Sequence, residues 1–93
     1  MVVGIARIEL HIPAAQSLKD KRQVVRSLKE RIRARVQAAV AEVDHQDLWQ
    51  RAALGVAVVS ADGAQVREML QSVRALADAT FEAQVIDWQE RIE

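Results

Sequence analysis

The sequence contains no cysteine, and this absence removes three kinds of chemistry. Without a thiol the chain can form no disulfide, hold no zinc ion through thiolates and use no cysteine nucleophile. A chain without disulfides suits a reducing compartment, so we expect a cytoplasmic protein. The amino terminus also lacks a basic leader with a cleavage site, and no apolar run approaches the ~18 residues that span a bilayer. We therefore expect a soluble, unprocessed chain with no membrane association.

Aromatic residues are nearly as scarce, since Trp49, Phe81 and Trp88 are the only three among 93 residues. Yet 51% of the residues are hydrophobic, so the core must be built from Val, Leu, Ile and sixteen Ala. A chain of this length has room for one modest core. We expect residues 1–93 to form a single domain.

A net charge is absent as well, but the two signs are unevenly distributed. Thirteen Lys and Arg balance thirteen Asp and Glu. Between Lys19 and Arg35, eight positive residues stand against two negative ones, which gives a local charge of +6. The other residues carry five positive against eleven negative charges, or −6. The molecule is therefore strongly dipolar, and this asymmetry points to a charged partner.

The segment Ser17–Val36 is predicted to form one long helix. Ser17 and Asp20 fit a capping box, because Ser17 can accept from an amide of the first turn and Asp20 can reach back to the cap. Apolar residues recur at helical spacing and form one stripe that must be buried: Leu18, Val25, Leu28, Ile32 and Val36. Lys21 falls near this stripe. It either covers its stem while its ammonium reaches water, which is the favoured interpretation, or meets a partner at the sheet end.

Five positive residues of the same helix lie beside the apolar stripe, within roughly 80° of one another on the helical wheel. We call this set the basic ridge: Lys19, Arg22, Arg26, Lys29 and Arg33. Clustered cations release counterions when they bind nucleic-acid phosphates, so the ridge is a candidate RNA-binding surface. The alternative is a solvated helix face whose charge is balanced by acidic residues elsewhere in the fold.

The remaining elements follow from shorter patterns. In Val2–Ile12 apolar residues on one parity alternate with Arg7, Glu9 and His11 on the other, which is typical of a half-buried strand. Pro13 and the residues after it separate this strand from the long helix. We also predict strands at Ala38–Asp44, Arg51–Ser60 and Thr80–Trp88, a helix from Asp62 to Ala79, and a frayed tail at Gln89–Glu93.

The order strand, helix, strand, strand, helix, strand predicts the ferredoxin-like α+β fold, a four-stranded antiparallel sheet with both helices on one face. Right-handed crossovers bring three places to one end of that sheet: the end of the first strand, the start of the long helix and the turn after the second strand. We call the residues expected there the sheet-end cluster: His11, Lys21, Asp44, Asp47 and Trp49.

Two segments are more specific than fold physics requires. Ser17–Arg22 reads Ser-Leu-Lys-Asp-Lys-Arg, and Asp47–Arg51 reads Asp-Leu-Trp-Gln-Arg. With Leu10–Pro13, Ala41–Asp44 and Leu54–Gly55, they make the chain resemble, over nearly its full length, the YlxP-like family of small bacterial proteins of unknown function. The resemblance implies a ferredoxin-like fold. Genes of this family tend to lie beside genes for translation initiation and ribosome maturation, which implies a role close to ribosomal RNA.

The resemblance implies no reaction, catalytic residue or cofactor. The chain departs from the family pattern at Val36–Ala39, where Val-Gln-Ala-Ala stands in place of the more usual Phe-Asn-Val-Ser. A stacking role for an aromatic residue at that point therefore does not carry over.

The sheet-end cluster admits two chemical interpretations and one structural one. Together with His45, its imidazole and carboxylate groups could form a metal site or a small acid/base active site. However, no metal-ligand spacing, nucleophile or phosphate loop accompanies them, and strand alternation points Asp44 and His45 to opposite faces. In the simpler interpretation Asp44 and Asp47 accept turn amides, and His11 pairs with a carboxylate. We expect no metal and no catalytic residue.

Trp49 could be a platform for base stacking, but a plug over the sheet end or a dimer anchor is the favoured interpretation. The open sheet face lacks the aromatic pair of RNA-recognition motifs, so RNA is expected along the basic ridge. That face should expose Val3 and Ile5, which suggests a homodimer. The leading hypothesis is a non-enzymatic RNA-contacting accessory factor of translation that binds ribosomal RNA or a ribosomal subunit. The alternatives are a homodimeric interaction module and a small enzyme or metal site at the His11 and Asp44 end.

Overall fold

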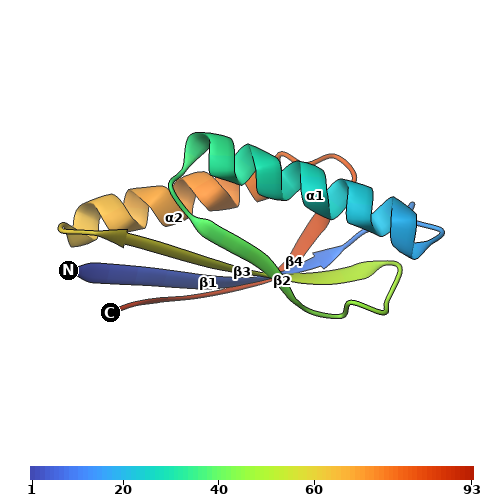
Figure 1. Ribbon diagram of the computed structural model, residues 1–93, viewed down its shortest axis with the longest axis horizontal. Helices are drawn as coiled ribbons and strands as arrows, with labels where there is room; N and C mark the ends of the chain where they lie inside the picture. Colours follow the sequence, from blue (N-terminus) through green and yellow to red (C-terminus); the bar gives the residue numbers. More distant parts are fainter.

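The computed structural model describes residues 1–93 and has the predicted order of elements. The elements are β1 (Val2–His11), α1 (Leu18–Arg35), β2 (Ala39–Asp44), β3 (Arg51–Ser60), α2 (Gly63–Asp78) and β4 (Gln84–Ile92). The strands form one antiparallel sheet in the order β2-β3-β1-β4, and Figure 1 shows both helices on the same face. The predicted ferredoxin-like α+β fold is confirmed.

The sheet is built on β1, which pairs with β3 on one side and with β4 on the other. Its alternation is the predicted one, because Ala6, Ile8 and Leu10 are buried under the helices while the intervening side chains face away from them. Gly4 lies where α2 comes closest. A Cβ atom there would lie 2.5 Å from Val66 Cγ1, so the close packing of α2 on the sheet requires glycine.

Helix α1 begins as predicted, with the Asp20 amide donating to Ser17 Oγ at 3.0 Å. The apolar stripe is buried from Val25 to Val36, and it joins a core cluster of nineteen residues that contains only Val, Leu, Ile and Ala. Helix α1 packs over β2 and β3, whereas α2 packs over β1, β3 and β4. The basic ridge is therefore carried on the β2 side of the molecule. Neither helix is long and apolar enough to cross a membrane.

The last strand differs from its prediction at both ends. It begins at Gln84, after a turn at Thr80–Ala83, and it continues to Ile92, so the prediction of a frayed tail at Gln89–Glu93 is wrong. Even Glu93 exchanges two backbone hydrogen bonds with Val3, at 2.7 and 2.8 Å. The alternation is weak because β4 is an edge strand that is largely exposed on both faces, so its sequence carries polar residues on both parities.

Candidate nucleic-acid interface and polar clusters

The basic ridge runs along the flank of α1 that lies beside the free edge of β2. Lys19, Arg22, Arg26 and Arg33 are exposed, and Lys29 is half-buried. Its orientation is fixed near the carboxyl end, where Arg33 Nη2 donates to the Val40 carbonyl oxygen of β2 at 2.7 Å. With a rise of 1.5 Å per residue, the fourteen steps from Lys19 to Arg33 place five cations along about 21 Å.

None of the five ridge cations takes part in an ion pair. The ion pairs of the chain lie on the open sheet face, at Lys21, near the end of α2 and at the end of β4. The two acidic residues of α1 do not neutralise the ridge either: Asp20 accepts from the Gln16 amide at 3.0 Å, and Glu30 forms no ion pair. The acidic residues that balance the total charge thus leave the positive charge of the ridge without a close counterion.

Arg33 has a structural role in addition to its place in the ridge. β2 is an edge strand, and its outward carbonyl groups would be open to pairing with another chain. Arg33 covers the Val40 carbonyl, and Gln46 Nε2 donates to the Glu42 carbonyl at 3.4 Å. Because a guanidinium has five N–H donors, Arg33 keeps others that can meet an anion.

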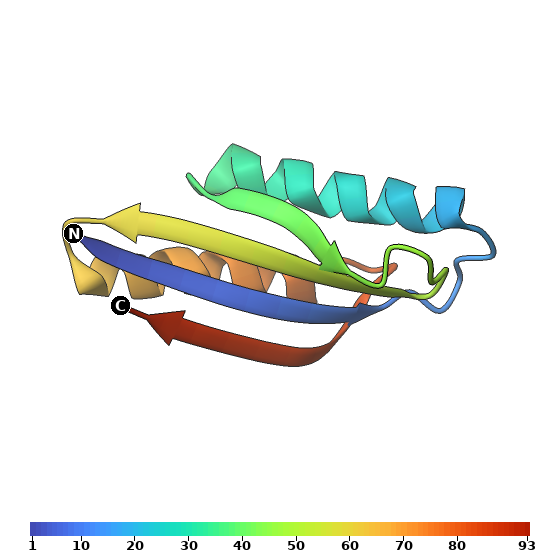
Figure 2. The same ribbon diagram turned by 60° about the horizontal axis from the view of Figure 1, so that its bottom comes forward.

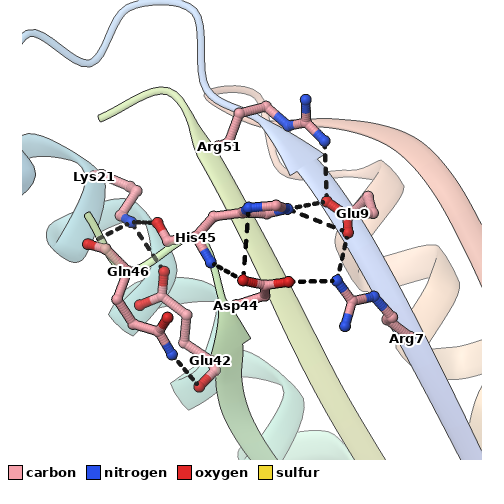
Figure 3. Close-up of polar contacts among 8 residues, drawn as sticks. All are labelled: Arg7, Glu9, Lys21, Glu42, Asp44, His45, Gln46 and Arg51. Carbon is pink, nitrogen blue, oxygen red and sulfur yellow. Dashed lines mark hydrogen bonds and ion pairs between the residues drawn. The ribbon is translucent and has the colours of Figure 1, made fainter. Parts of the chain in front are cut away.

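A network of charged side chains occupies one half of the open sheet face, centred on Glu9 of β1 (Figure 3). Arg7 Nη2 donates to Glu9 Oε1 at 2.8 Å, and Arg51 Nη2 donates to Glu9 Oε2 at 3.1 Å. His45 Nε2 lies 3.0 Å from Glu9 Oε2 and must be the donor, because an ionised carboxylate only accepts. Below the network Ala53 is fully buried, although it faces away from the helices.

Asp44 and His45 join this network from β2, which contradicts the expectation that they point to opposite faces. A bulge shifts the register so that Glu42 opposes Leu54 and Asp44 opposes Ala53. His45 then takes a positive φ of 63°, which turns its ring back over the open face. Asp44 Oδ2 accepts from Arg7 at 3.2 Å, and its Oδ1 accepts from the His45 amide at 2.8 Å, as predicted for a turn.

The network shifts the ionisation of its members. Desolvation by itself raises the pKa of the Glu9 carboxyl, but the hydrogen bonds from Arg7 and Arg51 and the charge of His45 outweigh it, and the net pKa is lowered. The hydrogen bond from the His45 amide, followed by that from Arg7, lowers the pKa of Asp44. Both carboxylates are therefore held in the charged form at neutral pH, which suits ion pairing better than proton transfer.

Lys21 is fully buried, so the expectation that its ammonium reaches water is wrong. Its Nζ donates to the His45 carbonyl at 2.8 Å and to the Gln46 carbonyl at 3.2 Å (Figure 3). It also lies 3.0 Å from Glu42 Oε2, close enough for an ion pair, although the angle is not that of a hydrogen bond. These contacts fasten the turn between β2 and β3 to the first turns of α1.

The other members of the sheet-end cluster do not converge on one site. His11 Nδ1 lies 3.2 Å from Gln84 Oε1, so its partner is an amide and the predicted carboxylate is wrong. Asp47 lies exposed in the turn, and only Asp44 accepts a turn amide, so the prediction that Asp47 does so is wrong. Trp49 is 55% exposed, which excludes the plug over the sheet end. The Lys21 side chain points from α1 to the β2–β3 turn, whereas Asp44 faces the open side of the sheet. No group of three or more His, Cys, Asp or Glu side chains could hold a metal ion.

Sequence reasoning missed the importance of Glu9, Arg51 and Glu42. The alternation of β1 correctly places Glu9 and Arg7 on its polar parity, but it does not encode the strand register that brings Arg51 beside Glu9. The signal that could have found the Lys21 pair is the position of Glu42. This acidic residue lies on the same parity of β2 as the buried Val40, so it faces the side that α1 covers.

Comparison with known proteins identifies sequence relatives. The sequence model of the family described as "Protein of unknown function (DUF503)" matches residues 3–90. The chain is 36% identical over 78 residues to the "Uncharacterized protein YlxP" of Bacillus subtilis (strain 168), which covers 84% of this chain and 85% of that protein. Among solved structures, the de novo designed protein Ferredog-Diesel aligns with 100% of this chain and 84% of its own, with 13% identity and a TM-score of 0.48.

Proposed function

Because the chain belongs to the DUF503 family of proteins of unknown function, we propose its function from its surface: it is a non-enzymatic protein that binds RNA through the basic ridge. The observation that carries this proposal is that no ridge cation has an ion-pair partner in the chain. A solvated face of a neutral protein normally mixes both signs. An uncompensated row of five cations attracts a polyanion and releases its counterions on binding.

The spacing of the ridge supports a polymer as the ligand rather than a single small anion. Its members are three or four residues apart, so one cation follows the next by about 5 Å along the helix axis. A row of that kind presents successive contacts to a backbone of regularly spaced phosphates. A lone phosphate or carboxylate would engage one or two of the cations and leave the rest unused.

Trp49 offers a second kind of contact, from a turn that lies near the start of the helix. Its turn is held against the segment before α1, because Gln50 Nε2 donates to the Pro13 and Ala15 carbonyls at 3.0 and 3.1 Å. Lys21 fastens the other end of the same turn. A half-exposed indole on a rigid turn provides a surface on which an unpaired base can stack, worth about 1–3 kcal/mol per base.

The charged network on the open face supports a structural role rather than a catalytic one. Each of its carboxylates already accepts from at least one cation within the chain. Their lowered pKa values keep them ionised, whereas a general acid or base works best with a pKa near the working pH. This arrangement leaves RNA binding without chemistry as the function that the surface supports best.

The resemblance to the YlxP-like family makes ribosomal RNA the first partner to test. The protein should co-sediment with ribosomal subunits at low salt and leave them as the salt concentration rises. Arg67 on α2 is exposed and has no ion pair, so Arg67→Gln is a matched control that removes one charge outside the ridge. Co-sedimentation should fall for Arg22→Gln and stay unchanged for Arg67→Gln. Failure of the unmodified protein to co-sediment at any salt concentration would contradict the ribosomal partner.

A further inference from the structure

The sheet face opposite the helices is covered by no other part of the chain (Figures 1 and 2). The strand registers divide its side chains into two halves. One half holds the Glu9 network described above. The other half lies toward the start of β1 and is apolar across three adjacent strands; we call it the apolar half, formed by Val3, Ile5, Ala41, Val43, Ala57 and Val59.

The apolar half is exposed and contiguous across neighbouring strands. Ile5 is 38% exposed, Val43 48% and Val59 54%. Ile5 opposes Ala57 in the sheet, and Val3 opposes Val59, so the exposed groups are contiguous across β1 and β3. Val43 lies over Gly55, since a Cβ atom at Gly55 would be 2.8 Å from Val43 Cγ1. Contiguous apolar surface on a regular sheet, bordered by charged residues, is typical of a protein interface.

The charges of the same face indicate which partner fits. Both signs are present on this side, with three positive and four negative side chains and a net charge of only −1: Arg7, Arg51, Arg91, Glu9, Asp44, Asp87 and Glu93. A face with no excess of positive charge offers no attraction to a nucleic acid, in contrast to the basic ridge. Two copies of a face that carries both signs in nearly equal number meet with little like-charge repulsion, and each apolar half can cover the other.

The area of the face is close to the lower limit for a stable pair. The strands β1, β3, β4 and β2 have ten, ten, nine and six residues and lie about 4.8 Å apart, so at about 3.3 Å per residue they present roughly 550 Å² of projected area. Stable interfaces begin near 600 Å² per partner, with about 800 Å² as the usual value. Two sheets packed face to face lie about 10 Å apart, and the small side chains of Ala41 and Ala57 allow that approach.

We propose that the open sheet face is the interface of a two-fold homodimer, in which the apolar half of each copy packs against its partner. The two helical layers then lie on the outer sides of the dimer. The basic ridge of each copy stays accessible, so this interface and RNA binding are independent of each other.

Sedimentation equilibrium of the full chain tests the proposal. The mass should rise from 10.4 kDa toward twice that value as the protein concentration increases. Val59→Asp places a charge in the apolar half, and because Val59 is more than half exposed the monomer should keep its fold. This change should weaken the dimer at least tenfold. The matched control is Phe81→Asp, since Phe81 is 95% exposed but lies in the turn before β4. The mass of the Phe81→Asp variant should rise with protein concentration as that of the unmodified chain does.

A second readout uses the absence of native cysteine. With Val59→Cys the rate of N-ethylmaleimide labelling should fall several-fold as the protein concentration rises, whereas Phe81→Cys should label at a constant rate. Three results would overturn the proposal: a mass of 10.4 kDa at about 1 mM protein, a dimer that survives Val59→Asp, or equal protection of both cysteines.

Discussion

Replacing Lys21 by methionine tests the buried contact that fastens the β2–β3 turn to α1. Methionine keeps an unbranched stem of similar length, so the change chiefly removes the ammonium group. Two carbonyl groups then lose a charged donor, at 2.8 and 3.2 Å, and the carboxylate of Glu42 loses its ion-pair partner at 3.0 Å. The Glu42 side chain is only 17% exposed, so water can replace little of the lost interaction with the ammonium group.

The size of the effect follows from that burial. Removing one partner of a buried ion pair costs about 3–5 kcal/mol, and the partial exposure of Glu42 reduces our expectation to about 2–4 kcal/mol. Urea unfolding at pH 7, followed by far-UV circular dichroism, measures this cost as a fall in the unfolding midpoint. Lys19→Met is the matched control on the same helix. Its side chain is exposed, so it should change stability by no more than about 0.5 kcal/mol.

A double variant identifies the physical cause. Lys21→Met combined with Glu42→Gln removes the carboxylate charge that Lys21→Met leaves without a partner. The double variant should therefore lose less unfolding free energy than the two single variants added together, by about 1 kcal/mol or more. A cost below about 1 kcal/mol for Lys21→Met alone would refute the reasoning. It would mean that the ammonium group contributes no more than an exposed one.

Three further predictions concern the fold. Leu28→Ala should lower the free energy of unfolding by about 2–5 kcal/mol in urea titration, because Leu28 is fully buried; a cost below 1 kcal/mol would place it outside the core. Gly4→Ala should cost about 1–3 kcal/mol, because its Cβ would meet Val66; a neutral effect would disprove the close contact. The lowered pKa of Glu9 stabilises the fold above the usual pKa of about 4.3, and this contribution is lost as pH falls through the lower folded value. Acid titration should therefore destabilise wild type more steeply than Glu9→Gln, and parallel curves would contradict the shift.

Local patterns made the core and the basic ridge predictable. The stripe of Leu28 and Ile32 and the Ser17 cap depend only on residues within one helix, so spacing alone places them. The wheel also places the ridge cations on one flank of α1, where the structure has them. RNA binding by that flank stays a prediction.

Non-local geometry explains what the sequence could not reveal. The wheel puts Lys21 beside the stripe, but only the tertiary fold brings the β2–β3 turn over its ammonium. Asp44 and His45 lie on the same sheet face because of a bulge in β2 and the positive φ of His45. The alternation of polar and apolar residues along a strand does not encode either feature. The extension of β4 to Ile92 comes from pairing with β1, because an exposed edge strand keeps no clear alternation.

The slope of log affinity against log salt for ribosomal RNA tests the central claim most directly. The variant Lys19→Gln, Arg22→Gln, Arg26→Gln removes three ridge charges and leaves the Arg33 contact with β2 in place. Each lost phosphate contact should reduce the slope by about 0.7–0.9, so the variant should show a slope lower by about 2–3, with unchanged unfolding in urea. An affinity of wild type that does not depend on salt, or a variant with the wild-type slope, would contradict RNA binding by the basic ridge.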